Sequence, residues 1–288
     1  MKRKTALYIT GVLLILNVFA WKEVFLLAGS SYLKVYFLDV GQGDSIFIET
    51  PQRHQILIDA GPDSIVLQKL QEIMPAKDMS LDLVILTHPE KDHLMGLLDV
   101  LQRYKIDYVL WTGVVRDTAE YKEWVELLEK AEQEGTRVLI AKEDTKLKAG
   151  DVVIDTLYPF EYLEGKELKS TSNDSCVVSK VVFGKDSFLF TGDITSKVEK
   201  ELISKESDLA SDVLKVAHHG SKYSTSDEFL ENVEAKIAVI SAGKDNYYGL
   251  PAPEVLQRLE KFGIQTLRTD KDGDVKIESD GKNIYLRK

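Results

Sequence analysis

The sequence predicts an α/β protein, because short apolar strands alternate with amphipathic helices from about residue 34 onward. The run over residues 83–86 is branched and free of charge, as in a strand buried within a sheet. Leucines at positions 94, 97, 98 and 101 then follow at helical spacing. With 288 residues, of which 44% are hydrophobic, the chain can bury a sizeable core.

The elements predicted for the first half are, in order, strands 34–40, 45–50 and 55–59, helix 65–74, strand 83–87, a helix after residue 93, strand 108–111, helix 118–134 and strand 136–140, then short antiparallel strands to residue 157 and a loop over 158–169. Those predicted for the second half are strands 175–183 and 187–191, helix 196–203, strand 212–217, helix 227–233, strand 236–241, helix 253–262 and strands 266–268, 275–278 and 283–286.

The N-terminal segment differs in kind from these elements. Basic residues at positions 2–4 precede an apolar run over residues 6–21, which indicates a targeting or membrane segment. Basic residues before such a run place the N-terminus in the cytoplasm and the rest of the chain outside. We therefore predict a single-pass anchor in the cytoplasmic membrane over residues 1–29 and an extracytoplasmic domain over residues 30–288. Cleavage of residues 1–20 would instead give a secreted protein.

Charge and cysteine content narrow the possible functions. The formal net charge of −10 excludes a broadly basic nucleic-acid-binding surface, although bound divalent ions would offset carboxylates locally. The single cysteine, Cys176, excludes an intrachain disulfide bond. It lies in a predicted strand, where we expect a small core residue rather than a nucleophile.

Potential metal ligands follow the strand predicted over residues 83–87. His88, Glu90, Asp92 and His93 occur within six residues, and two imidazoles with two carboxylates match the ligand chemistry of Zn²⁺, Mn²⁺ or Fe²⁺. An alternative needs no metal, because Asp92 could cap a helix that opens at His93.

Two later loops carry the same kinds of residue. His218 and His219 follow the predicted strand 212–217, and Asp193 follows the strand 187–191. Ligand sites in α/β sheets lie beyond the carboxyl ends of strands, although Asp193 could equally cap the next helix. The fifth histidine, His54, lies in a predicted turn and is expected to be a solvated surface residue.

Short motifs run along the chain in the order Leu-Asp-Val-Gly-Gln-Gly-Asp-Ser (38–45), Leu-Ile-Asp-Ala-Gly (57–61), Thr-His-Pro-Glu-Lys-Asp-His (87–93), Asn-Asp-Ser (173–175), Thr-Gly-Asp (191–193), His-His-Gly-Ser (218–221) and Asn-Tyr-Tyr-Gly (246–249). Together, over residues 33–288, they resemble the metallo-β-lactamase fold superfamily, and specifically the hydrolase domain at the C-terminal end of ComEC-type DNA-uptake proteins. The resemblance implies a four-layer αββα sandwich with a two-metal centre at one edge.

The same resemblance implies a role for each candidate residue. One ion would be held by His88 and Glu90, and the other by Asp92, His93 and one of His218 and His219, with His218 preferred. Asp193 would bridge the two ions, and Asp59 would orient a metal-bound histidine from behind. Catalytic roles are expected for Asp59, Asp92 and Asp193. Substrate contacts are expected from Asp44, Asn173, Ser175, Ser221, Lys222 and Asn246.

Three positions depart from the family pattern. Glu90 stands where aspartate is usual, Asn173 stands in a motif where zinc hydrolases carry histidine, and Leu250 replaces a histidine before Pro251. The resemblance implies two divalent ions. Because the last two departures remove imidazoles, we expect Mn²⁺ to be favoured, with Zn²⁺ possible.

These expectations combine into one leading function and two alternatives. The leading function is a membrane-anchored, metal-dependent phosphodiesterase or nuclease that acts on DNA in uptake or scavenging. The acidic net charge and the lack of long apolar runs after residue 29 favour instead a hydrolase of a small ester, lactone, thioester or phosphodiester. An inactive accessory scaffold is the third reading, and the retention of His88, Asp92, His93 and Asp193 argues against it.

Overall fold

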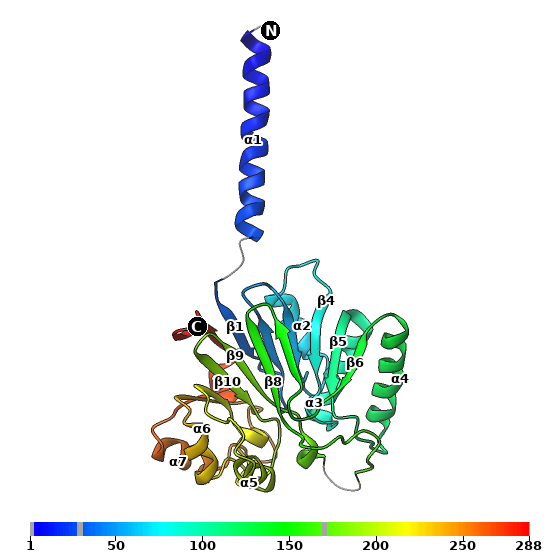
Figure 1. Cartoon of the computed structure of the whole chain (residues 1–288), viewed down its shortest axis with the longest axis vertical. Coiled ribbons are helices and arrows are strands. Elements are labelled where there is room, and N and C mark those ends of the chain that lie inside the picture. Colours follow the sequence, from blue (N-terminus) through cyan, green and yellow to red (C-terminus); the bar gives the residue numbers. More distant parts are fainter. Residues whose placement is uncertain (1–2, 28–30, 169–171, 288) are drawn as a thin grey trace.

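The computed structural model describes residues 3–27, 31–168 and 172–287. Two β-sheets pack face to face, and helices cover the outer face of each sheet (Figure 1). This arrangement confirms the predicted αββα sandwich.

The first sheet has the strand order β15-β14-β1-β2-β3-β4-β5-β6. Its strands are β1 (Leu33–Phe37), β2 (Ile46–Glu49), β3 (Gln55–Ile58), β4 (Ser80–Ile85), β5 (Lys105–Trp111), β6 (Arg137–Ile140), β14 (Val275–Ser279) and β15 (Ile284–Arg287). Strands β3 to β6 are parallel, so the loops that follow β3, β4 and β5 leave the sheet at the same edge.

The second sheet has the order β13-β12-β11-β10-β9-β8-β7. Its strands are β7 (Lys146–Ala149), β8 (Val152–Tyr158), β9 (Val178–Phe183), β10 (Asp186–Phe190), β11 (Val213–Lys215), β12 (Ile237–Ile240) and β13 (Gln265–Arg268). Here β10 to β13 are parallel, so the loops after β10, β11 and β12 also share an edge.

Helices α2 (Ile65–Ile73), α3 (Lys91–Arg103) and α4 (Ala119–Gln133) pack on the first sheet, and α5 (Ser196–Ser204), α6 (Asp227–Val233) and α7 (Pro253–Lys261) pack on the second. Leu94, Leu97 and Leu98 of α3 are buried, as their helical spacing predicts. A third apolar layer, which includes Phe37 and Phe188, fills the space between the sheets.

The predicted boundaries are close to the observed ones. The helices predicted over residues 65–74, 118–134 and 253–262 are α2, α4 and α7. The strand predicted over residues 212–217 ends early, because β11 gives way to the short helix η2 (Ala217–Gly220). The short helices η1 (Asn173–Ser175) and α8 (Thr269–Asp272) were not predicted.

The N-terminal helix α1 (Arg3–Leu27) stands apart from the two sheets in Figure 1, and the side chains of Leu13 and Trp21 are more than half exposed. Across the described residues, no helix is both long enough and apolar enough to cross a membrane. The predicted single-pass anchor and the extracytoplasmic location that depended on it are therefore wrong. The apolar run over residues 6–21 is shorter than the roughly 20 residues that a span needs. The predicted boundary between residues 29 and 30 lies outside the described residues.

Candidate metal centre

The loops that follow β4, β10 and β11 meet at one edge of the sandwich. There, one ligand atom from each of Asp92, His93, Asp193 and His219 lies within 4.8 Å of the others. Asp92 and His93 begin α3, which packs on the first sheet, whereas Asp193 and His219 follow strands of the second sheet. Asp92 and His219 are 127 positions apart in the sequence, and the tertiary fold brings them into one group.

The geometry of this group fits a divalent cation. Asp193 places one carboxylate oxygen 3.4 Å from Nε2 of His93 and the other 3.4 Å from Nε2 of His219. Asp92 Oδ2 lies 3.3 Å from the same His219 atom. Yet Nε2 of both histidines and Oδ1 of Asp193 are buried and have no hydrogen-bond partner among the described residues. Buried polar atoms normally have partners, and a metal ion at this point would supply one to all three.

His88 lies beside the group. Its ring centroid is 4.2 Å from that of His93, and within the part of the chain that the structure describes its buried Nε2 also lacks a hydrogen-bond partner. Burial lowers the pKa of His88 to about 3, so its imidazole is neutral at pH 7 and free to donate a lone pair to a metal.

Asp59 holds the two histidines of this loop from behind. Its carboxylate accepts hydrogen bonds from His93 Nδ1 (2.8 Å), the Thr87 amide (2.8 Å) and the Thr87 hydroxyl (2.6 Å). The Thr87 hydroxyl also lies 3.0 Å from Nδ1 of His88. Asp59 is fully buried, and its hydrogen bonds orient these side chains from behind.

Burial and neighbouring charge act in opposite directions on the group. Burial would raise the pKa of Asp193, but His219 and His93 outweigh it and hold that pKa well below its ordinary value. Burial would lower the pKa of His93 and of His219, yet Asp193 and the neighbouring carboxylates raise both. Without a metal ion, two protonated imidazoles therefore neutralise the carboxylates in the centre.

Asp44 lies buried behind His219, and the substrate contact expected of it stays a prediction. It is buried, its Oδ2 lies 2.7 Å from Nζ of the fully buried Lys215, and its Oδ1 lies 3.3 Å from Nδ1 of His219. Its loop packs so closely on α3 that a Cβ at Gly43 would lie 2.1 Å from the Asp92 carbonyl oxygen. The motif Gly-Gln-Gly-Asp therefore places a carboxylate behind His219.

Glu90, which was predicted to hold the other ion with His88, lies outside this group. Its Oε1 accepts hydrogen bonds from the amide (3.1 Å) and hydroxyl (2.9 Å) of Ser172 and lies 3.2 Å from Nη2 of Arg116. Arg116 comes from the loop after β5, and sequence spacing gives no sign of this long-range pair. A ligand role for Glu90 stays a prediction.

His219, and not the preferred His218, lies in the group of potential metal ligands. His219 Nε2 joins the group, whereas His218 Nε2 lies 3.9 Å from Asp193 and its side chain is 30% exposed. Both residues have left-handed backbone angles, with φ of 51° and 54°. The alternation expected of a strand therefore does not apply here, and the residue nearer to the strand is not the one that joins the group.

Comparison with known proteins decides the family. Residues 38–244 match the sequence model of the metallo-beta-lactamase superfamily. The chain belongs to this superfamily. Among solved structures, the metallo-beta-lactamase fold protein YhfI from Bacillus subtilis is similar, with a TM-score of 0.56 at 14% identity over 87% of this chain and 100% of that chain. Igni18, a metallo hydrolase from Ignicoccus hospitalis, gives a TM-score of 0.54 at 15% identity over 84% of this chain and 98% of that chain.

Competence proteins are similar in sequence to this metallo-β-lactamase superfamily member. ComE operon protein 3 of Bacillus subtilis is 34% identical over 264 residues, which cover 85% of this chain and 33% of that protein. Competence protein ComA of Neisseria gonorrhoeae is 31% identical over 239 residues, or 82% of this chain and 30% of that protein. The chain thus spans about a third of the length of these relatives. These matches confirm the predicted resemblance to the ComEC-type hydrolase domain, and the family and the His/Asp group together indicate a metal-dependent hydrolase.

A pocket of 540 Å³ opens over the metal centre of this superfamily member. Of the predicted substrate-binding residues, only Asn173 lines it, with Nδ2 3.3 Å from Nε2 of His218. Ser175 is buried and donates to the Ser172 carbonyl, and Ser221 accepts from the Tyr223 amide. The other two predicted residues are Lys222, which is exposed, and Asn246, which bonds within its own loop.

Sequence reasoning missed several residues that line this pocket: Gln42, Arg116, Thr195, Tyr223 and Tyr248. Two of them lie inside quoted motifs, Gln42 in residues 38–45 and Tyr248 in residues 246–249, so their position was a usable signal. Arg116 lies between predicted elements, and no local pattern marks it.

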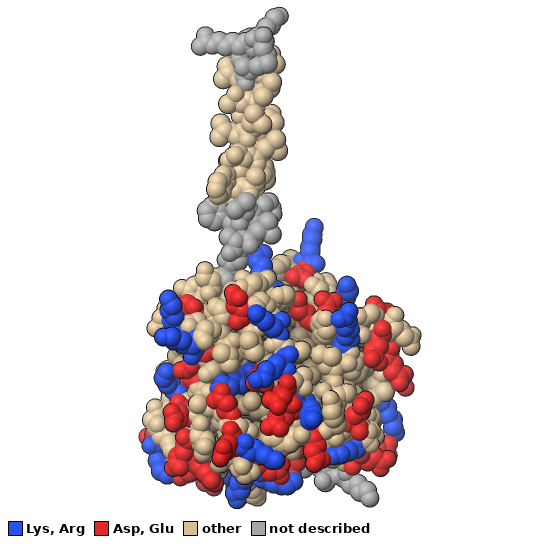
Figure 2. All heavy atoms as spheres, in the orientation of Figure 1, with Lys and Arg blue, Asp and Glu red and all other residues tan. Residues whose placement is uncertain are grey.

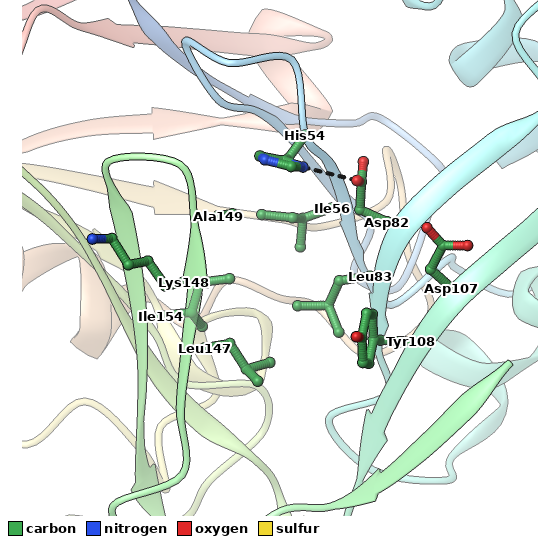
Figure 3. A pocket seen from close by; sticks show the side chains of 10 residues that line it. All are labelled: His54, Ile56, Asp82, Leu83, Asp107, Tyr108, Leu147, Lys148, Ala149 and Ile154. Atoms are coloured by element: carbon green, nitrogen blue, oxygen red, sulfur yellow. Dashed lines mark hydrogen bonds and ion pairs between the residues drawn. The ribbon is translucent and has the colours of Figure 1, made fainter.

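A second pocket, of 280 Å³, lies near the first residues of β4, whereas the metal centre follows the last ones. Figure 3 shows Ile56, Leu83 and Tyr108 facing the β7–β8 hairpin across it. His54 lines this pocket and pairs with Asp82 at 2.8 Å, so it has a partner and is only partly exposed.

Proposed function

We propose that the chain is a divalent-metal-dependent phosphodiesterase that cleaves DNA. The observation that carries this proposal is the group of Asp92, His93, Asp193 and His219, whose buried Nε2 atoms lack partners beneath an open pocket. The name of one relative, Competence protein ComA, supports a substrate connected with competence.

The residues behind the centre fix how its histidines present their nitrogen atoms. His93 donates from Nδ1 to Asp59, and His219 donates from Nδ1 to the Ser241 carbonyl at 3.0 Å. Each ring therefore turns the lone pair of Nε2 towards Asp193 once the extra proton is lost. A bound divalent ion would supply the Lewis acidity that polarises a phosphoryl group and activates water.

Arg116 lines the pocket, and its positive charge suits a phosphodiester substrate. Its guanidinium lies beside Glu90 at the pocket wall, with 14% of the side chain exposed. A guanidinium binds phosphate oxygens through paired N–H donors, and it stabilises the charge that develops during phosphoryl transfer. We propose that Arg116 binds the phosphate of the substrate.

Charge distribution favours a second candidate, a hydrolase of small esters or lactones. The net charge is −10, and on the face shown in Figure 2 Lys and Arg are interspersed with Asp and Glu rather than gathered in a stripe. The pocket is also of a size that suits a small ligand.

One experiment separates these candidates. The purified chain is reconstituted with Mn²⁺ or Zn²⁺, its metal content is measured, and hydrolysis of plasmid DNA, bis-p-nitrophenyl phosphate and a homoserine lactone is followed. The proposal predicts cleavage of both phosphodiesters, its loss in Asp193→Ala, and normal activity in Asp107→Ala, a control that changes an exposed carboxylate near the second pocket. Metal-loaded chain that hydrolyses only the lactone would support the second candidate, and chain that binds no metal would overturn both.

A further inference from the structure

Three exposed tyrosines lie on loops of the second sheet near the metal centre. Tyr223 is 66% exposed, Tyr247 is 99% exposed and Tyr248 is 72% exposed. Tyr223 follows η2 and Tyr248 follows β12, so two separate loops present them. Both rings line the pocket over the metal centre, whereas Tyr247 does not.

The loop that carries Tyr248 is braced by its own side-chain hydrogen bonds. Asn246 Nδ2 donates to the carbonyls of Gly243 (2.9 Å) and Leu250 (2.6 Å), and Asn246 Oδ1 accepts from the Leu250 amide (3.0 Å). These bonds brace the backbone of residues 243–250. Tyr248 is 72% exposed and lies on this braced loop at the pocket.

The loop that carries Tyr223 is held from α7. Arg258 donates to the carbonyls of Ser224 (2.9 Å) and Thr225 (2.8 Å), and the Ser224 hydroxyl donates to the Ile194 carbonyl (2.7 Å). A fixed aromatic ring loses little conformational freedom when a ligand stacks on it. Both loops therefore offer a prepared aromatic surface at the pocket.

Cations accompany the two rings. Lys222 Nζ lies 5.2 Å from the centroid of the Tyr223 ring, and Arg116 lines the same pocket from the first sheet. Aromatic rings next to cations are how proteins bind unpaired nucleotides, because bases stack on the rings and phosphates contact the cations. In a duplex, neighbouring base pairs already cover each base face, so only an unpaired or end base can stack on a side chain.

We propose that Tyr223 and Tyr248 form a stacking subsite for a nucleobase adjacent to the scissile phosphodiester, so that this site takes nucleic acid with unpaired bases. This inference rests on the proposed phosphodiesterase function. It adds a substrate feature, the free base, and names the two residues that recognise it.

The test compares Tyr223→Ala and Tyr248→Ala with the matched variants Tyr223→Phe and Tyr248→Phe, which keep the ring. The probes are a short single-stranded oligonucleotide, its blunt duplex and an abasic oligomer of equal length. Each alanine variant should raise the Kd and KM for the single strand roughly 5- to 100-fold, the range that loss of one stacked base gives. The phenylalanine variants and Tyr247→Ala should stay near wild type, and the abasic oligomer should not distinguish any of these proteins.

Several results would overturn the subsite: equal losses on the abasic oligomer, equal losses in Tyr247→Ala, or wild-type affinity for the blunt duplex equal to that for the single strand. Binding is measured by fluorescence anisotropy after EDTA treatment, and cleavage is measured with Mn²⁺. Tyrosine-dependent binding without cleavage would leave the subsite standing and end the phosphodiesterase proposal. Cleavage that does not depend on either tyrosine would end the stacking subsite and leave the phosphodiesterase proposal standing.

Discussion

The buried ion pair between Lys215 and Asp44 should be essential to both stability and metal binding. The two side chains are 0% and 2% exposed and lie 2.7 Å apart. Removing one partner of a buried pair costs about 3–5 kcal/mol, because the other charge stays buried without compensation. His219 also faces Asp44, at 3.3 Å, so we expect the lower end of this range for Lys215→Met, about 3 kcal/mol. The melting temperature should then fall by about 6–12 °C.

The pH dependence of this loss follows from the carboxylate. Burial would raise the pKa of Asp44, but Lys215 and His219 outweigh it and lower the pKa below the ordinary value of 3.8. A carboxylate whose pKa is lower in the folded state contributes stability that is present above its unfolded pKa and is lost as pH falls towards the folded pKa. The difference between wild type and Lys215→Met should therefore be full at pH 7 and should shrink below about pH 4.

Urea denaturation in EDTA measures the loss of stability, and titration with Mn²⁺ measures the second effect. Because Asp44 contacts His219, the variant should bind Mn²⁺ about tenfold more weakly. Lys236→Met is the matched control: Lys236 pairs with Asp212 at the same 2.7 Å distance but is 77% exposed, so it should lose less than about 1 kcal/mol. The reasoning would be refuted by similar losses in the two variants.

Three further predictions concern the metal centre and its pocket. Asp193→Ala should abolish most metal binding without unfolding the chain. Glu90→Ala removes the partner of Arg116 and should change the metal content little. Elemental analysis after reconstitution compares the metal content of the two variants. Mn²⁺ should support phosphodiester cleavage better than Zn²⁺, and Asn173→His should shift the ratio towards Zn²⁺, with an unchanged ratio contradicting the ligand argument. Asn246→Ala should cost roughly 1–3 kcal/mol of stability, by analogy with other lost hydrogen bonds, and should raise KM for DNA more than it lowers kcat.

The sequence was most informative where chemistry follows a regular strand. The αββα sandwich was implied by the resemblance of the motifs. The apolar run of β4 and the helical spacing after it predicted an α/β fold and placed His88 and His93 beyond the end of a strand. These signals are local, because strand and helix periods decide which residues face the core. The same holds for Asp193, which lies just beyond β10.

Predictions that depended on long-range contacts or on unusual backbone angles did less well. Glu90 pairs with Arg116, which is 26 positions away in the sequence. Asp44 pairs with Lys215, which is 171 positions away. No periodicity reports such pairs. The choice between His218 and its neighbour turned on left-handed backbone angles that L-residues adopt only when tertiary contacts demand them.

The division of the metal group between the two sheets couples ion supply to folding. Asp92 and His93 belong to the first half of the sandwich, and Asp193 and His219 belong to the second. An ion held by all four acts as a cross-link that the unfolded chain cannot offer, and free ion at one hundred times its Kd adds about 2.7 kcal/mol to the unfolding free energy. A shortage of the ion would therefore weaken the contact between the two halves as well as leave the metal site unfilled, and resistance to proteolysis would report the free concentration of the ion around the protein.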